Sequence, residues 1–443
     1  MKALRNFFVT GRFFYILGGL TLVMMLAYPF PFLLPVVKTA IVLLAIVCLI
    51  DTVLLFNPRV RVSALRETAP VLSLGDDNPV KLSVSNRSGQ TLSLEVIDEL
   101  PEQLQVRNFA FRRVLPPLSH YTHEYQVRPV ARGEYRFGKI HVFLSTPVGL
   151  IRRRISFDQE VALPVYPSII QMKKYGLSTF ARTAAEYGVK KVRRIGHSYE
   201  FEHIRQYQRG DDYRSINWKA TGRRAQLMVN QYEDERSQPV YCIIDKSRVM
   251  HMPFHGLSLF DYAVNASLVI SNIVLGKQDK AGLITFAEKP YTLLRASRSK
   301  TQLKKILEAL YKEREGAVEA DYESLYMAMR KLVSGRSLLF LYTNFETTYA
   351  LHRVLPQLRK LNNQHLLVVV FFENTEITTH RPASADTLED VYTQITAEHY
   401  TLTKFQLIQQ LRQFGIFSML TKPENLTVNT INKYLELKSR GMI

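Results

Sequence analysis

Residues 240–247 read "VYCIIDKS", and this stretch decides the fold class of the C-terminal half of the chain. The run that ends at Asp245 is continuously apolar, which is typical of a strand covered on both faces. Residues 258–276 follow with apolar side chains at helical spacing, and Gly276 ends that pattern. Further strands are expected at 282–287, 337–343, 365–372 and 416–420, with amphipathic helices between them. Strands that alternate with helices predict a doubly wound parallel α/β sheet over residues 239–443.

Residues 57–165 carry a different pattern, in which apolar and polar residues alternate with period two. Two alternating runs lie on either side of residues 86–89, which is a hairpin signal, and no helical periodicity interrupts the alternation. The pattern predicts an antiparallel β-sandwich of immunoglobulin-like type. Because this segment carries no cluster of catalytic side chains, we expect it to be a spacer or an interaction module.

The N-terminal segment, residues 1–56, contains two uncharged apolar runs, 13–28 and 39–50, separated by a proline-containing turn. Each run with its apolar flank reaches the roughly 20 residues that a membrane span requires. A cleaved signal peptide would have one such run, and two buried core helices would need amphipathic partners that are not found nearby. We therefore predict a transmembrane helical hairpin.

The basic residues that flank the hairpin predict its orientation. They are Lys2, Arg5 and Arg12 before the first span and Arg59, Arg61 and Arg66 after the second. By the positive-inside rule both flanks face the cytoplasm, so the soluble domains are expected there. Asp51 lies near the inner end of the second span, where we expect it to reach lipid headgroups and water; a functional intramembrane carboxylate is the alternative.

The net charge of +19 fits a protein held against anionic membrane lipid. Nucleic acid is the competing partner, but the basic residues are spread along the chain and no zinc-finger or RNP-like pattern is found, so nucleic-acid binding is not expected. The cysteines, Cys48 and Cys242, form no CxxC pair and predict no disulfide framework.

Residues 166–238 are interpreted as a connector that carries the sequence "RQYQRGDDYRSINWKATGR" at 205–223. Charge-assisted pairs are expected within it, because Arg suits planar carboxylate partners. Trp218 is interpreted as a hydrophobic plug under the turn. The segment is predicted to be a structural clamp, with a partner-docking surface and a catalytic site as alternatives. The residues that carry these interpretations are Arg205, Arg209, Asp211, Asp212, Arg214, Asn217, Trp218 and Arg223.

A candidate cation site lies where ligands bind in open α/β sheets, at the carboxyl ends of the strands. Asp245 ends the first strand, Ser247 follows two residues later, and Asn344 follows the third strand. Their oxygens suit Mg²⁺, although Asn344 brings no charge and Val249 offers no oxygen.

The run from Gly196 to Ser247, together with "RGEYRFGKIHVFLSTPVGLIRR" at 132–153, resembles the bacterial domain-of-unknown-function 58 family. The resemblance covers nearly the whole chain. It implies a von Willebrand factor A-like α/β domain in a bacterial inner-membrane protein. It also implies a MoxR-type AAA+ ATPase as partner, in the assembly or maturation of other proteins, with no established catalytic activity.

The metal site that the resemblance implies is incomplete in this sequence. Asp245 and Ser247 match its DxSxS motif, Val249 replaces the second serine, and Asn344 stands where an aspartate is expected. The segment that would supply a threonine has Asp321 and Ser324 instead. Mg²⁺ is possible at this degenerate site, but a metal-free site stabilised by hydrogen bonds is the expected state, and no other cofactor is implied.

The common enzyme signatures, including phosphate loops, HExxH and GxSxG, are not found in the sequence. We therefore expect a non-enzymatic, membrane-anchored interaction module. One alternative is a hydrolase that uses Asp211, Asp212 or Asp245. Another is a basic scaffold that binds anionic lipid or nucleic acid through the "KKVRR" cluster at 190–194.

Overall fold

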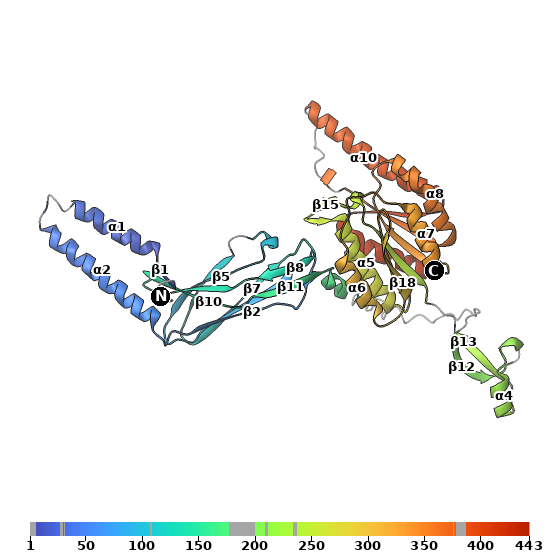
Figure 1. The fold of residues 1–443 in the computed structure, drawn as a ribbon, viewed down its shortest axis with the longest axis horizontal. Coiled ribbons are helices and arrows are strands. Elements are labelled where there is room, and N and C mark those ends of the chain that lie inside the picture. Colours follow the sequence, from blue (N-terminus) through green and yellow to red (C-terminus); the bar gives the residue numbers. More distant parts are fainter. Residues whose placement is uncertain are drawn as a thin grey trace. The chain divides into compact units, whose positions relative to one another are not determined.

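The computed structural model of the chain describes residues 6–26, 30, 32–106, 109–176, 200–208, 211–233, 237–374, 376–377 and 387–442. The chain divides into two compact units, Met1–Tyr166 and Pro167–Ile443 (Figure 1). The first combines two apolar helices with mostly antiparallel β-structure, and the second contains a largely parallel sheet covered by helices. The expected mixed α/β architecture is thereby confirmed. The basic cluster at 190–194 and Arg209 lie outside the described residues.

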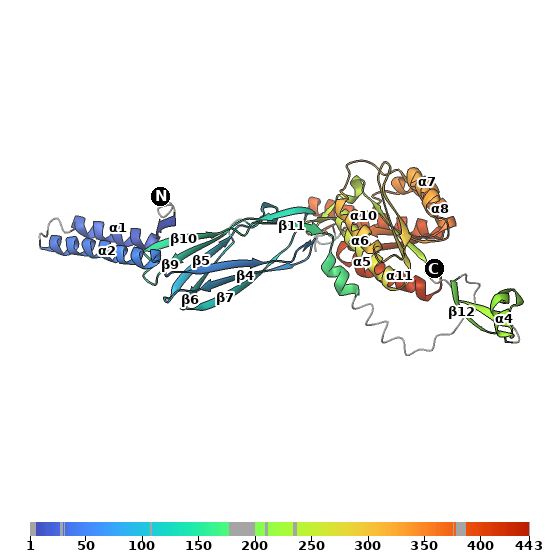
Figure 2. The same cartoon turned by 60° about the horizontal axis from the view of Figure 1, so that its bottom comes forward.

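The first unit begins with two helices, α1 (Gly11–Leu26) and α2 (Leu33–Phe56), which contact each other and lie side by side in both ribbon views (Figures 1 and 2). Within the described residues, α2 and one helix of the second unit, Leu259–Gly276, are long and apolar enough to cross a membrane. They differ in burial, because 6% of the apolar window of α2 is buried against 72% for the other helix. The first is thus a candidate anchor, and the second is a core helix.

The β-structure of the first unit consists of short strands in three sheets. The strands are β1 (Phe7–Val9), β2 (Val62–Glu67), β3 (Leu72–Ser73), β4 (Asn78–Asn86), β5 (Leu92–Asp98), β6 (Ala110–Leu115), β7 (Ser119–Val127), β8 (Gly133–Phe137), β9 (Ile140–Ser145), β10 (Ile151–Phe157) and β11 (Val161–Tyr166), with the short helix η2 (Glu102–Leu104). The sheet orders are β1-β10-β9-β5-β6, β2-β4-β7 and β3-β11-β8.

The period-two pattern of the sequence positions these strands. In β5 the residues Leu92, Leu94 and Val96 are buried and their neighbours are partly exposed, because successive side chains of a strand point to opposite faces. The expected antiparallel pairing is found throughout the unit except between β3 and β11, which are parallel. A strand that the sequence pattern did not reveal, β1, precedes the first helix and pairs with β10.

Asp51 fastens the end of α2 to the loop before β10, so the expectation that it reaches headgroups and water is wrong. Its side chain is 2% exposed and accepts hydrogen bonds from the backbone N–H groups of Leu150 and Ile151, both at 3.1 Å, and from the Thr146 hydroxyl. Arg153 of β10 donates to the Leu55 carbonyl oxygen at 2.8 Å. A carboxylate that satisfies two buried backbone donors has no need of solvent, and this explains its burial.

The second unit is built on a six-stranded sheet of order β18-β17-β14-β19-β20-β21. Its strands are β14 (Pro239–Asp245), β17 (Lys280–Phe286), β18 (Pro290–Ser297), β19 (Leu338–Tyr342), β20 (Leu366–Phe372) and β21 (Phe417–Thr421). Its helices are α5 (Leu259–Gly276), α6 (Gln302–Lys312), α7 (Tyr322–Leu332), α8 (Thr348–Gln364), α10 (Leu388–Gln413) and α11 (Leu426–Ser439). Between them lie η4 (Arg248–Met250), β15 (Pro253–Phe254), β16 (Leu257–Ser258) and η5 (Pro423–Asn425). All neighbouring strands of the sheet pair in parallel except β17 and β18.

Both faces of this sheet are buried. Val240, Cys242 and Ile244 of β14 belong to an apolar cluster that includes residues of α5, α6 and α11. Tyr241 and Ile243 belong to a second cluster that includes residues of α7, α8 and α10. The uninterrupted apolar run of β14 is therefore explained by helices on both sides of the strand.

The conspicuous motif at 205–223 belongs to a small hairpin of β12 (Glu200–Gln206) and β13 (Met228–Glu233), which pair antiparallel. Between the two strands lie η3 (Tyr213–Ser215) and the short helix α4 (Trp218–Arg224). An isolated bridge between Ile216 and Val229 ties the loop to β13.

Candidate functional site

The carboxyl edge of the six-stranded sheet brings together the predicted residues Asp245, Ser247 and Asn344. After β14 the chain moves to β17 on one side and then returns to β19 on the other. The loops that follow β14 and β19 therefore leave in opposite directions, which opens a crevice between them. Asp245 ends β14, and Asn344 lies two residues beyond β19. A pocket of about 380 Å³ lies at this edge, and these three residues line it.

Asp245 is fully buried and hydrogen-bonded. Its Oδ1 accepts from the Ser247 N–H at 2.9 Å, and its Oδ2 accepts from the Thr343 hydroxyl at 2.7 Å. The Tyr322 hydroxyl lies 2.8 Å from that of Thr343 and donates to Asp245 at 3.4 Å. Burial raises the pKa of Asp245, whereas the hydrogen bonds from Ser247, Thr343 and Tyr322 act in the opposite direction. The carboxylate thus stabilises the strand ends and is withdrawn from solvent.

Two further polar groups at this edge have no hydrogen-bond partner. They are the Ser247 hydroxyl and the Asn344 amide nitrogen, both buried in side chains that line the pocket. The Ser247 hydroxyl makes no well-formed hydrogen bond, although it lies close enough to the Asp245 carboxylate to act on its pKa. Buried polar groups are normally satisfied, so these two are available to hydrogen-bond with a molecule in the pocket, including water.

Lys404 of α10 holds the oxygen of Asn344. Its Nζ donates to Asn344 Oδ1 and to the Phe345 carbonyl oxygen, both at 2.6 Å, and the lysine is 3% exposed. This contact joins residues 60 positions apart in the sequence and fixes α10 against the edge of the sheet.

The donor set does not fit Mg²⁺. This ion requires near-octahedral oxygen ligands, usually with carboxylates among them. Asp245 is the one carboxylate among Asp245, Ser247 and Asn344, and Asn344 already accepts from a lysine ammonium group. Within the described residues no cluster of three or more His, Cys, Asp or Glu side chains could hold a metal ion.

The buried lysine makes stability depend on pH. Burial lowers the pKa of Lys404 to about 8, with Glu346 acting in the opposite direction. Since an unfolded lysine titrates near 10.4, the unfolded state binds more protons than the folded state between about pH 8 and 10. The free energy of unfolding of the α/β sheet should therefore rise across this interval, by at most about 1.4 kcal/mol per pH unit.

The matched variant for this prediction is Lys404→Met, which keeps most of the length of the unbranched side chain and removes the titrating group. The free energy of unfolding of both proteins is measured by urea unfolding of the full chain between pH 7.5 and 9.5. Pulse proteolysis reports which fraction of the sheet region is unfolded at each urea concentration. The free energy of unfolding should rise less with pH in the variant than in the unaltered chain. Equal rises in the two proteins would show that Lys404 does not lose its proton in this range.

In the hairpin motif the two adjacent aspartates accept hydrogen bonds from different residues. Asp211 accepts from Arg205 at 2.6 Å and from the Gln208 N–H at 2.8 Å, and the Arg205 hydrogen bond lowers the pKa of its carboxyl. Asp212 caps η3 by accepting from the Arg214 N–H at 3.0 Å. Both carboxylates thus accept hydrogen bonds within the hairpin motif, and each has a role in its local structure.

Three other predicted residues of the motif lie in or beside α4. Asn217 caps the helix by accepting from the Ala220 N–H at 2.9 Å, and Arg223 lies in its last turn. Trp218 is 71% exposed, so the interpretation of this residue as a buried plug is wrong. The reason is local, because Trp218 begins a seven-residue helix in which no residue is buried. The roles of clamp and docking surface stay predictions.

The sequence analysis missed an exposed apolar stripe on α10. Tyr400 and Lys404 lie on the buried side of this helix, and Leu407 and Leu411 pack into the core. The opposite side of the helix exposes large apolar side chains at helical spacing between residues 388 and 402. They are Leu388, Val391, Tyr392, Ile395 and Leu402. Residues 388, 392 and 395 have the i, i+4, i+7 spacing of one helix face, which can be read in the sequence. The spacing is hard to recognise there because polar residues lie between these positions.

Comparisons with known proteins match this chain to proteins of unknown role. Residues 203–379 match the family model described as Protein of unknown function DUF58, a range that includes the hairpin motif and β14 to β20. The uncharacterized protein YeaD of Bacillus subtilis (strain 168) is 27% identical over 224 residues. That alignment covers 49% of this chain and 54% of YeaD, so the chain spans about half the length of this curated relative.

Solved structures give weaker likenesses. The conserved hypothetical protein BatB from Bacteroides thetaiotaomicron is 12% identical with a TM-score of 0.29, and covers 46% of this chain and 100% of its own. A PapD-like domain of human CEP192 is 11% identical with a TM-score of 0.20, and covers 25% of this chain and 90% of its own. At these TM-scores neither likeness identifies the fold.

Proposed function

Because the chain belongs to the family described as Protein of unknown function DUF58 through residues 203–379, we propose that it is a membrane-anchored, non-enzymatic module that docks a protein partner. In this proposal α1 and α2 form a transmembrane hairpin in a bacterial inner membrane, and the soluble parts are cytoplasmic. The sheet of the second unit is a von Willebrand factor A-like domain. The partner is a MoxR-type AAA+ ATPase, as the family resemblance implies.

The apolar stripe of α10 carries this proposal. Leu388 is 76% exposed, Tyr392 67% and Ile395 58%, and all three lie on one side of a single helix. Exposed apolar surface of this kind marks interaction sites, and an amphipathic helix is a common way to present it to a groove of another protein. On the opposite side of the same helix, Lys404 donates to Asn344 and Phe345, and these contacts hold α10 in place while the stripe stays exposed.

The chemistry of the carboxylates supports binding over hydrolysis. A general acid near neutral pH needs a raised pKa and access to substrate. Asp245 has a raised pKa but is fully buried behind its hydrogen bonds, and Asp211 has a lowered pKa and pairs with Arg205. Neither carboxylate combines both properties.

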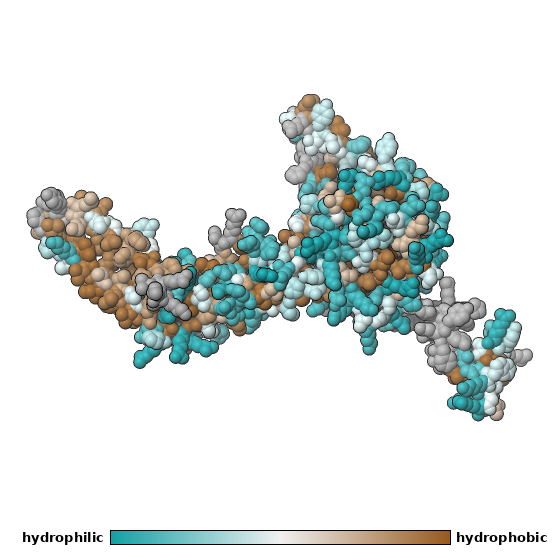
Figure 3. All heavy atoms as spheres, viewed as in Figure 1, coloured by the Kyte–Doolittle hydropathy of each residue, from teal (hydrophilic) through white to brown (hydrophobic). Residues whose placement is uncertain are grey.

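The apolar surface of the two N-terminal helices supports the proposal that they form a membrane anchor. Apolar residues cover α1 and α2 (Figure 3), and among the most exposed are Tyr15, Met25, Phe32 and Leu49. A helix that exposes such side chains all round requires an apolar solvent or a partner. Arg12, Arg59 and Arg61 lie at the opposite end of the pair from the turn, which fits an inner-leaflet position under the positive-inside rule.

Paired charge substitutions on the stripe test the docking proposal. Tyr392→Glu/Ile395→Glu places two carboxylates on the docking surface and should abolish co-purification of an AAA+ ATPase from detergent extracts. The matched control, Leu293→Glu/Met327→Glu, changes exposed apolar residues on β18 and α7 and should retain it. Equal recovery with both variants would exclude the stripe, and recovery of no ATPase with the unaltered chain would count against the named partner.

A further inference from the structure

A second pocket, of about 500 Å³, lies at the end of α1 in the first unit. It is lined by residues from four places in the sequence: the segment that begins α1, the start of β5, strand β6, and the loop that leads into β10. Three of the lining residues are arginines, Arg12, Arg112 and Arg152, and several others carry hydroxyl groups. No acidic side chain is among the described residues that line it.

One carboxylate outside the lining orients two of these arginines. Glu95 of β5 accepts from Arg112 Nε at 2.8 Å and from Arg152 Nη1 at 2.5 Å. Each guanidinium has five N–H donors, so both keep donors for another anion. Arg12 has no carboxylate partner among the described residues. Three positive charges against one negative leave the site with an unbalanced positive charge.

Hydrogen bonds join the elements on the inner side of the pocket. The Thr10 hydroxyl donates to the carbonyl oxygens of Gly149 and Leu150, at 2.8 and 3.0 Å. Thr146 donates to the buried Asp51. These contacts hold the first turn of α1 and the loop before β10 in place, and the positive end of the helix dipole adds to the attraction for an anion.

We propose that this pocket binds the phosphate group of an anionic phospholipid. Guanidinium groups match phosphate oxygens in geometry and are weakly hydrated, so three of them around one pocket suit this ligand. The choice of a lipid over a soluble phosphate rests on the proposed transmembrane hairpin, because the first turn of α1 and the end of α2 then lie at the level of the inner-leaflet headgroups. Lipid in this pocket would contact the helix and the β-structure together.

The test uses the full chain purified in detergent, with phosphatidylglycerol titrated and bound lipid counted by native mass spectrometry. The variant is Arg12→Gln/Arg112→Gln. It is expected to bind phosphatidylglycerol roughly 30-fold more weakly, since each arginine near an anionic lipid surface contributes about a fivefold factor. The matched control is Arg113→Gln/Arg136→Gln, which removes the same charge. Arg113 follows Arg112 on β6 and therefore points to the opposite face.

Phosphatidylcholine and glycerol 3-phosphate are the comparison ligands, the first a lipid without net charge and the second a soluble phosphate. The proposal predicts weak binding of both, and loss of phosphatidylglycerol binding in the pocket variant alone. Equal loss in the control would show a diffuse charge effect and overturn the site. Glycerol 3-phosphate that competes at the same concentration as lipid would overturn the lipid as the ligand. Membrane fractionation of the variants separates this result from a failure of the anchor itself.

Discussion

Replacing Arg66 with methionine should destabilise the β-structure of the first unit by about 3–5 kcal/mol, because the substitution leaves a buried carboxylate without its partner. Arg66 of β2 pairs with Asp98 of β5, and their side chains are 2% and 0% exposed. Arg66 also donates to the carbonyl oxygens of Gln159 and Gly138, at 2.9 and 3.0 Å. Burial and the neighbouring Asp98 carboxylate raise the pKa of Tyr125, which stays a neutral donor to Asp98 at 2.6 Å.

Hydrogen exchange of β2 and β5 in the full chain measures this effect, since the single tryptophan, Trp218, lies in the other unit and cannot report it. Two controls sharpen the result. Arg136→Met removes an exposed pair with Glu134 and should change little. Arg66→Met/Asp98→Leu removes both buried charges and should recover most of the loss. If the double variant is as unstable as the single one, the unpaired charge is not the cause.

Replacing Asp51 with leucine should open the joint between α2 and the β-structure. The two backbone N–H groups that Asp51 satisfies, at Leu150 and Ile151, would be left buried without acceptors. Each such group costs about 1–3 kcal/mol, so the local free energy of opening should fall by roughly 2–6 kcal/mol. Hydrogen exchange of a peptide covering residues 146–153, in detergent or nanodiscs, measures this change directly.

Thr52→Val is the matched control for the joint. The Thr52 hydroxyl donates to the Cys48 carbonyl within α2 and makes no bond to the loop before β10. Its removal should leave exchange at 146–153 unchanged. Protection of that peptide in the Asp51→Leu variant equal to the parent would mean that the apolar contacts of Leu55 and its neighbours hold the joint without the carboxylate.

Local patterns in the sequence were sufficient for most elements of the fold. Val240 to Ile244 are all apolar because helices cover both faces of β14, and residues 259–276 show the spacing of the core helix α5. The N-terminal half of α10 was missed, since its apolar side chains face outward and the pattern of a core-facing helix is not present there. The strand β1 was missed because three residues are too few for an alternation to be read.

The chemistry of the site was predicted less completely, because it depends on contacts between distant residues. Asp245, Ser247 and Asn344 were expected at one edge, since strand ends can be read from the sequence. The contact of Lys404 with Asn344 spans 60 positions, and that of Asp51 with Ile151 spans 100. No periodicity relates such pairs. The sequence therefore offered Asn344 only as a candidate ligand of a degenerate metal site, and it led to the expectation that Asp51 faces headgroups and water.

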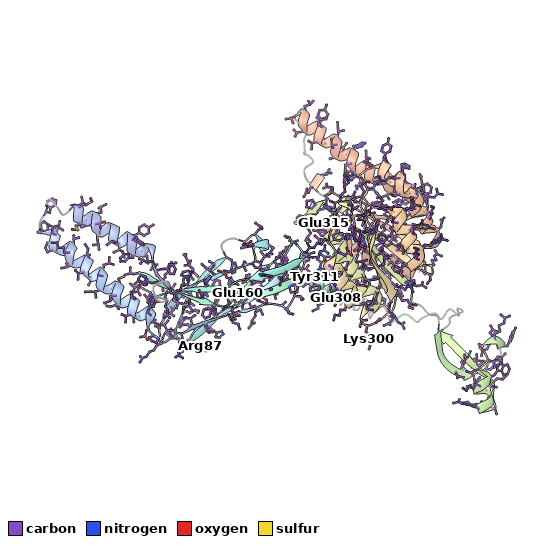
Figure 4. All side chains as sticks on the ribbon, viewed as in Figure 1. Arg87, Glu160, Lys300, Glu308, Tyr311 and Glu315 are labelled. Carbon is purple, nitrogen blue, oxygen red and sulfur yellow. The ribbon has the colours of Figure 1, made fainter. Side chains whose placement is uncertain are left out.

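The most direct test of the central claim, a membrane-anchored platform that docks a protein through α10, is site-specific crosslinking in living cells. A photo-crosslinking amino acid replaces Tyr392 on the exposed stripe or, as a control, Lys300, which follows β18 and is labelled in Figure 4. The account predicts a covalent adduct with an AAA+ ATPase, in the membrane fraction, from position 392 only. The absence of any protein adduct at 392, or the same adducts from both positions, would contradict it.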